Sequence, residues 1–461
     1  MNNLNNSPPP HADCPGPPLP YRSLKGPVPS READHTPHKH VGTTMDFKSI
    51  RSSLLFRVVI AIILGIVCSL FFPVWLAQIF TTFNGLFGNF LNFFIPVLIF
   101  ALIAPAIAGL GRGAGKWLGI VAGIAYASTI LSGLLAYAAS RALYPWMLAD
   151  HANISEIDLD ADALVPYFSI EMPPPFEVMT ALLLAFCLGL GMTVVKSENL
   201  YKVTRELERV VMKVITAFVI PLLPLFIFGI FLGLGMNGGL VEIMSAFGKV
   251  LILAVVGTLV FLTIQFITAG VIAGRNPWTL FKNMLPAYFT ALGTSSSAAT
   301  IPVTYQQTLK NDVDVNVAGF VVPLCATIHL AGSMMKIGLF AFAVVYIYDI
   351  QVSVGLALGF LLMLGITMIA APGVPGGAIM AATGMLASML GFNTEQVALM
   401  IAAYIAIDSF GTAANVTGDG AIAVIVNKLS KGRISETHQE DLPEEDRVEF
   451  GITPSDIEHR G

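Results

Sequence analysis

Charged side chains are scarce in this chain. Asp, Glu, Lys and Arg make up 12% of its 461 residues, whereas soluble domains contain about 25%. Hydrophobic residues make up 55%, and the mean hydropathy is +0.74. Apolar runs of about 20 residues, which is long enough to cross a bilayer, recur from Leu54 to Val426. The composition therefore excludes a soluble enzyme and predicts an all-α polytopic membrane protein.

Cysteine is also rare, and motifs for catalysis are missing. The four cysteines show neither a metal-ligand spacing nor a disulfide framework; they are Cys14, Cys68, Cys187 and Cys325. The sequence contains no nucleotide-binding loop, metal-ligand cluster or nucleophile triad. We therefore predict no enzymatic activity and no nucleic-acid partner.

Both ends of the chain lack apolar periodicity. Residues 1–45 are rich in Pro, His, Ser and Asn, which is typical of a disordered tail. They do not carry the basic start and short apolar core of a secretory signal. Residues 430–461 are polar and acidic. We therefore predict a membrane domain at 46–429 between two cytoplasmic tails.

Basic residues are distributed unevenly between the predicted spans. Lys and Arg gather before the first span, between the second and third, between the fourth and fifth, and after the sixth, whereas the 141–172 connection is mainly acidic. The positive-inside rule then places the basic connections and both termini in the cytoplasm, with the protein in the cell (inner) membrane. The predicted spans are 54–73, 85–110, 116–140, 175–195, 213–236 and 246–274.

Two long uncharged stretches do not fit simple spans. Residues 283–309 lie between two lysines and contain GTSSSAAT at 293–300, so the chain is expected to enter from the cytoplasm and return. Residues 350–394 lie between two acidic residues and are broken at APGVPGG, 371–377, which suits a hairpin entering from outside. A pair of interrupted segments from opposite faces indicates an inverted-repeat transporter with a site near the midplane.

Four polar side chains follow one another in an apolar surrounding near the end of the membrane domain. Their steps of four, three and four place them along one face of a helix. A charge in hydrocarbon is costly, so it normally faces a cavity or a partner. We therefore predict an ion or substrate site, with buried ion pairs to His329 or Lys336 as the alternative. The four residues are Asp408, Thr412, Asn415 and Asp419.

Three motifs resemble those of the dicarboxylate/amino acid:cation symporter family: GTSSSAATIPVT at 293–304, GVPGGAIM at 373–380 and DxxxTxxNVTGD at 408–419. The resemblance covers about residues 50–430. It implies eight transmembrane helices plus two re-entrant helical hairpins, a homotrimer, and an elevator movement of a transport region (about 116–140 and 246–429) past scaffold helices (about 54–110 and 175–236).

The resemblance also implies roles for individual residues. Hairpin serines would bind the substrate's α-carboxylate, an aspartate its ammonium, and a threonine its side chain. The tip of the second hairpin would act as a gate. The substrate-binding residues implied in this way are Ser296, Ser297, Val374, Gly376, Asp408, Thr412 and Asn415, and the sodium ligands are Asn415 and Asp419.

The chain departs from the family pattern at the position of its substrate-binding arginine. Acidic-substrate members carry an arginine where this chain has Gly411, and the positions of supporting arginines hold Ser295 and Ser409. The usual bidentate donor for a second carboxylate is therefore missing. Gly411 would leave room for a larger or neutral side chain, which favours a neutral amino acid.

A second departure concerns the seventh family helix, where the usual NMDGT is HLAGS at 329–333. Ala331 removes a cation-binding carboxylate. His329 and Lys336 would share a helical face with Ser333, and both titrate readily when desolvated. We interpret His329 and Lys336 as candidates for proton coupling. Alternatively, Lys336 pairs with a substrate carboxylate, or both form static salt bridges with Asp408 or Asp419.

These features predict a secondary active symporter. It would import a small amino acid, with a neutral one favoured, or a dicarboxylate, and it would need no cofactor beyond Na+ or H+ as coupling ion. Membrane lipid and further copies of the chain are its expected partners. The alternatives are an uncoupled anion-conducting or facilitating family member and a membrane sensor that does not transport.

Overall fold

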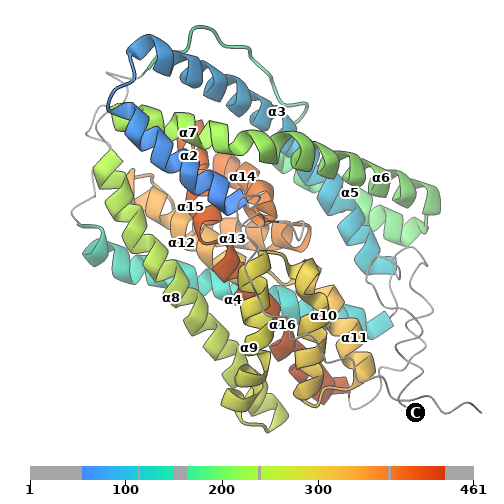
Figure 1. Ribbon diagram of the computed structural model, residues 1–461. Coiled ribbons are helices and arrows are strands. Elements are labelled where there is room, and N and C mark those ends of the chain that lie inside the picture. Colours follow the sequence, from blue (N-terminus) through green and yellow to red (C-terminus); the bar gives the residue numbers. More distant parts are fainter. Residues whose placement is uncertain (1–53, 113–114, 150–163, 237–239, 372–374, 431–461) are drawn as a thin grey trace, which may run out of the picture. The chain divides into compact units, whose positions relative to one another are not determined.

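The computed structural model describes residues 54–112, 115–149, 164–236, 240–371 and 375–430, all within one compact unit, and these residues form helices and connections without strands. Both predicted tails lie outside the described residues. The helices are α2 (Leu54–Ser69), α3 (Val74–Arg112), α4 (Gly115–Met147), α5 (Val178–Val195), α6 (Glu198–Val214), η3 (Ile215–Val219), α7 (Ile220–Met236), α8 (Leu240–Ala273), α9 (Pro277–Thr294), α10 (Ser297–Lys310), α11 (Val315–Ile328), α12 (Ala331–Ile347), α13 (Val354–Ile369), α14 (Gly377–Leu390), α15 (Thr394–Ala406) and α16 (Asp408–Ser430) (Figure 1).

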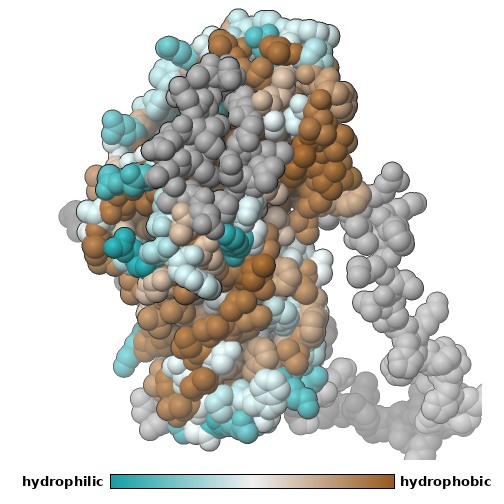
Figure 2. Space-filling model, turned by 90° about the vertical axis from the view of Figure 1, so that its left-hand side faces the viewer, coloured by the Kyte–Doolittle hydropathy of each residue, from teal (hydrophilic) through white to brown (hydrophobic). Residues whose placement is uncertain are grey.

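The described helices are those of a multi-pass membrane protein. Six are long and apolar enough to cross a bilayer, and α15 with α16, bent by 62°, can form a seventh span. Large hydrophobic side chains are exposed along α2, α5 and α8, and apolar residues cover much of the face shown in Figure 2. Exposed apolar surface on this scale indicates contact with lipid or protein rather than water. The predicted membrane class is confirmed.

Several predicted span limits are wrong. Helix α3 begins at Val74, eleven residues before the predicted start at 85, and α4 continues to Met147. Residues 198–212, predicted as a connection, form α6 and run on through the π-helical turn η3 into α7. Helix α6 is strongly amphipathic, and Ser197 caps its N-terminus by accepting from the Leu200 N–H. Span prediction from hydropathy does not detect such a polar helix, because it searches for apolar runs.

Each of the two uncharged stretches forms two consecutive helices. In the first, α9 ends where Ser295 adopts a left-handed conformation (φ 51°), and the Ser296 side chain caps α10 by accepting from the Ala299 N–H. In the second, α14 follows Gly376, whose φ is 74°. The tip at 372–374 lies outside the described residues. Helix α9 packs against α10, and α13 packs against α14. Helices α9 and α10 also pack against α16.

Helix α16 lies at the centre of the helices that follow residue 240, and it packs against α8 to α12 (Figure 1). Every residue of α12 from Ala331 to Val344 is buried. Helices α11 and α12 are separated by two non-helical residues, His329 and Leu330. A helix break in the interior leaves backbone donors and acceptors that need partners. Side chains of α16 supply some of these partners.

Candidate functional site

The four polar residues predicted to share a helix face all lie on α16, and all are buried. We call this row of four side chains the stripe. It begins at Asp408, the first residue of the helix, and ends at Asp419, which is 1% exposed. A buried carboxylate is stable only with a partner. The two carboxylates have different partners, and they are described in turn.

Asp408 is engaged at both carboxylate oxygens. Its Oδ2 accepts a hydrogen bond of 2.8 Å from the Gly376 N–H at the start of α14. Its Oδ1 lies 3.3 Å from Lys336 Nζ of α12. The Lys336 side chain is fully buried, and its ammonium also lies 3.8 Å from the centre of the Tyr404 ring, a favourable cation–π contact. The N-terminus of α16 therefore holds a buried ion pair, which the start of α14 contacts through Gly376.

Lys336 occupies the space beside Gly411. A Cβ at position 411 would collide with Cε and Nζ of Lys336. Gly411 follows Asp408 by almost one helical turn, so its bare backbone forms one wall of the lysine pocket. The space that the sequence suggested for a larger substrate is thus filled by a side chain of the protein itself.

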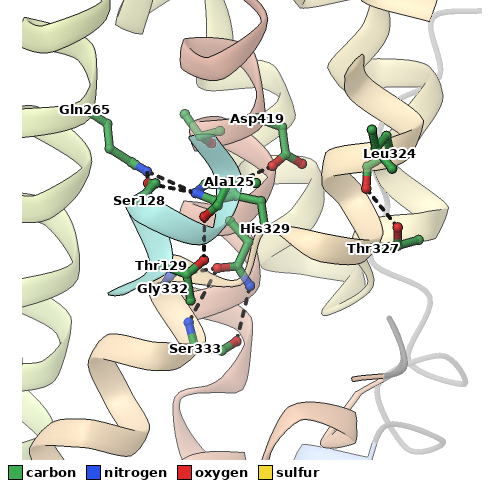
Figure 3. A network of polar contacts seen from close by, with 12 residues as sticks. Ala125, Ser128, Thr129, Gln265, Leu324, Thr327, His329, Gly332, Ser333 and Asp419 are labelled. Atoms are coloured by element: carbon green, nitrogen blue, oxygen red, sulfur yellow. Dashed lines mark hydrogen bonds and ion pairs between the residues drawn. The ribbon is translucent and has the colours of Figure 1, made fainter. Parts of the chain in front are cut away.

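Asp419 is paired with His329 of the α11–α12 break. His329 Nδ1 lies 2.8 Å from Asp419 Oδ1. On the other side of the ring, Ser128 Oγ and Gln265 Nε2 each lie 3.1 Å from His329 Nε2 (Figure 3). Gln265 Nε2 is a donor, so His329 Nε2 accepts and Nδ1–H donates to Asp419. This arrangement describes a neutral imidazole.

The second oxygen of Asp419 has no partner. Among the described residues, Asp419 Oδ2 is the one buried side-chain nitrogen or oxygen without a hydrogen bond. An ionised carboxylate beside a neutral histidine carries an uncompensated charge, which is costly in the interior. A hard cation such as Na+ takes oxygen ligands of this kind, and a proton would neutralise the same group. The chemistry of this end of the stripe fits cation binding.

Asn415 links the stripe to the helix break. Its Oδ1 accepts from the N–H groups of Gly332 (2.7 Å) and Ser333 (3.4 Å), and its Nδ2 donates to Ser333 Oγ at 3.2 Å. Ser333 Oγ also contacts the Tyr404 hydroxyl at 2.9 Å. A Cβ at Gly332 would lie 2.5 Å from the Gly411 carbonyl oxygen, so only glycine allows this approach. Asn415 therefore satisfies the free amides at the start of α12.

The other predicted site residues lie as follows. Ser296 caps α10, and Ser297 is buried in its first turn. Thr412 Oγ1 bonds to the Asp408 carbonyl at 3.1 Å, a common interaction within a helix. Val374 lies outside the described residues. The described contacts thus bring together Gly376, Asp408, Gly411 and Lys336, with Ser296 and Ser297 on a neighbouring helix of α16.

One prediction about this region is wrong, and two residues were missed. His329 and Lys336 do not share a helical face, because the helix breaks at His329; they reach opposite ends of the stripe. Gln265 was missed, although it is an isolated amide in an apolar run. Tyr404 was missed too, although it precedes Asp408 by four residues.

The arrangement is that of a multi-pass membrane protein with a buried polar site on α16, next to the α9–α10 pair and the start of α14. Residues 54–429 match the model of the sodium:dicarboxylate symporter family, and the chain belongs to this family. It is 28% identical over 397 residues to the serine/threonine transporter SstT of Acinetobacter baumannii (strain AYE), covering 83% of this chain and 98% of the relative. It is 34% identical over 158 residues to human excitatory amino acid transporter 1, covering 34% of this chain and 29% of the relative. The protein is therefore of a transporter family and is not an enzyme.

Proposed function

We propose that the protein is a secondary active symporter that imports a small carboxylate-bearing solute, an amino acid or a dicarboxylate, with a coupling cation. The observation that carries this proposal is the buried stripe on α16. One end is contacted by the second hairpin through Gly376, and the other keeps a free carboxylate oxygen at Asp419. In this proposal, substrate and coupling ion bind at separate ends of a single helix.

The substrate end has the groups that a carboxylate needs. Helix α10 begins at Ser297 beside the Ser296 hydroxyl and packs on α16. The N-terminus of a helix offers backbone N–H groups and a positive dipole end, and both favour a carboxylate. Thr412, Gly376 and Val374 would complete the site. The names of the similar transporters, for serine and threonine in one case, are consistent with a solute of this size.

The coupling end is Asp419 with Asn415, and His329 is their neighbour. Sodium is the coupling ion that the family description suggests. A proton is the alternative, with His329 and Lys336 as candidate carriers. The remaining features are part of the same proposal: eight transmembrane helices with two re-entrant hairpins, elevator movement of the transport region, a homotrimer, and termini in the cytoplasm.

An uncoupled facilitator is the second candidate. It is favoured by Ala331, which stands where family members carry a cation-binding carboxylate, and by the hydrogen bond that already engages Asp419 with His329. A protein of this kind would equilibrate its solute across the membrane without accumulating it.

The test is uptake into liposomes that contain the purified protein, with sodium and proton gradients imposed separately. We expect accumulation of labelled amino acids or C4-dicarboxylates under one gradient. Asp419→Asn should remove the gradient dependence, whereas exchange of internal for external solute should persist. Equal uptake with and without gradients would favour the facilitator. Ligand binding without any flux would contradict transport and favour a sensor.

A further inference from the structure

We infer that Lys336 is an internal counter-cation that takes the place of a substrate ammonium at Asp408, so that the site selects carboxylates without an amine. This inference rests on the proposed function, because it assigns the substrate class of the same site. It is carried by the contacts of Lys336, by those of Asp408, and by the balance of charges between them.

The contacts of Lys336 are saturated. An ammonium group has three donors, and Lys336 Nζ has three acceptors at 3.3 Å: the carbonyl oxygens of Ile407 and Asp408, and Asp408 Oδ1. The two carbonyls lie at the bend between α15 and α16. Tyr404 covers the same ammonium with its ring. The lysine is therefore held as an integral part of the site.

Each oxygen of Asp408 already has a donor within the protein. Lys336 binds Oδ1, and the Gly376 N–H binds Oδ2. The Asp408 side chain is only 9% exposed. A substrate ammonium would have to share this carboxylate with the lysine and with the Gly376 N–H.

Repulsion between two ammonium groups points the same way. Lys336 and Asp408 together are neutral. A substrate ammonium would place two cations against one carboxylate in a poorly screened interior, where like charges repel strongly. A carboxylate without an amine avoids this repulsion beside Lys336. It carries one more net negative charge than its amino partner, which the coupling cation of the proposed function balances.

Gly411 is the partner that makes this possible. A side chain at position 411 would collide with the end of Lys336. The lysine on α12 and the glycine on α16 therefore form one unit, in which the positive charge comes from a different helix than in family members with an arginine at this position.

The test compares pairs of compounds that differ in the amine. Succinate is compared with L-aspartate, and glycerate with L-serine, by calorimetric binding to the purified protein and by uptake into liposomes. We expect succinate and glycerate to bind with dissociation constants at least about tenfold lower than those of their amino partners. One hydrogen bond to a charged group changes an equilibrium constant by about that factor or more. Equal or tighter binding of L-aspartate or L-serine would overturn the inference, as would failure of succinate and glycerate to bind.

Two variants test the residue itself. Lys336→Met keeps most of the side-chain volume and frees Asp408, so the binding ratio should shift at least about tenfold towards the amino compounds. The double variant Lys336→Met with Asp408→Asn keeps the site neutral. It has no carboxylate at position 408 to attract an ammonium, so it should not gain the preference for amino compounds that Lys336→Met gains. An unchanged ratio in Lys336→Met would overturn the inference. Binding of succinate without uptake would sink the proposed function while supporting the role of Lys336.

Discussion

The two buried carboxylates at the ends of the α16 stripe have different partners. Asp408 is bound to a lysine and a backbone amide, so both of its oxygens are satisfied. Asp419 is bound to a neutral histidine, and one of its oxygens has no partner. The first carboxylate is balanced by the protein itself, whereas the second still needs a positive charge. We therefore expect a cation from solution to bind at Asp419 and not at Asp408.

Asp408→Asn should have the largest effect on stability. It leaves the Lys336 ammonium buried without a carboxylate, and breaking a buried ion pair in this way costs about 3–5 kcal/mol. The free energy of unfolding in detergent micelles measures the loss. The double variant Asp408→Asn with Lys336→Met should recover most of it, because no charge then remains. A single variant as stable as the unmodified protein would mean that the pair is not formed.

Gly411→Ala should come second. The new methyl group collides with the end of Lys336, and inserting a methyl group into a well-packed core costs about 1–3 kcal/mol. Gly119→Ala on α4 is the matched control, because a Cβ there meets nothing within 4 Å. Thermal unfolding of both variants gives the comparison. Equal stability of the two would contradict the packing of Lys336 on Gly411.

Ser128→Ala should have a smaller effect at the other end. It removes the hydrogen bond to His329 Nε2 and the 2.8 Å bond from Gln265 Nε2 to Ser128 Oγ, but leaves the contact between Gln265 and His329. Loss of these two neutral hydrogen bonds costs about 1–2 kcal/mol, since each contributes about 0.5–1.5 kcal/mol and Gln265 can rearrange. The unfolding transition should shift accordingly, while the succinate-to-aspartate binding ratio stays unchanged. A changed ratio would show that the two ends of the stripe are coupled.

Asp419→Asn should change stability least and completes the comparison, because the same substitution is made at both ends. The asparagine carbonyl still accepts from His329 Nδ1–H, and no charged partner is left behind. We expect the free energy of unfolding to change by less than about 1 kcal/mol. A loss as large as that of Asp408→Asn would show that His329 is charged and that the two ends are equivalent.

The sequence was informative wherever the signal is local. The scarcity of charge predicted the membrane class, and the steps from Asp408 to Asp419 predicted a shared helix face. Each of the two uncharged stretches does form two consecutive helices. These features depend on hydrophobicity and on the helical repeat, and both are properties of neighbouring residues.

The partners within the site were decided by the tertiary structure. Neither residue of the break, His329 or Leu330, is proline or glycine. The amides of Gly332 and Ser333 just after the break are bound by Asn415, which lies more than 80 residues further along the chain. The sequence left open whether Lys336 pairs with Asp408 or Asp419, and only the bend before α16 brings Asp408 to the lysine. Gly411 likewise suggested free space until Lys336 was seen to fill it. Helical periodicity orients a side chain on its own helix, but which side chain meets it depends on how the helices pack.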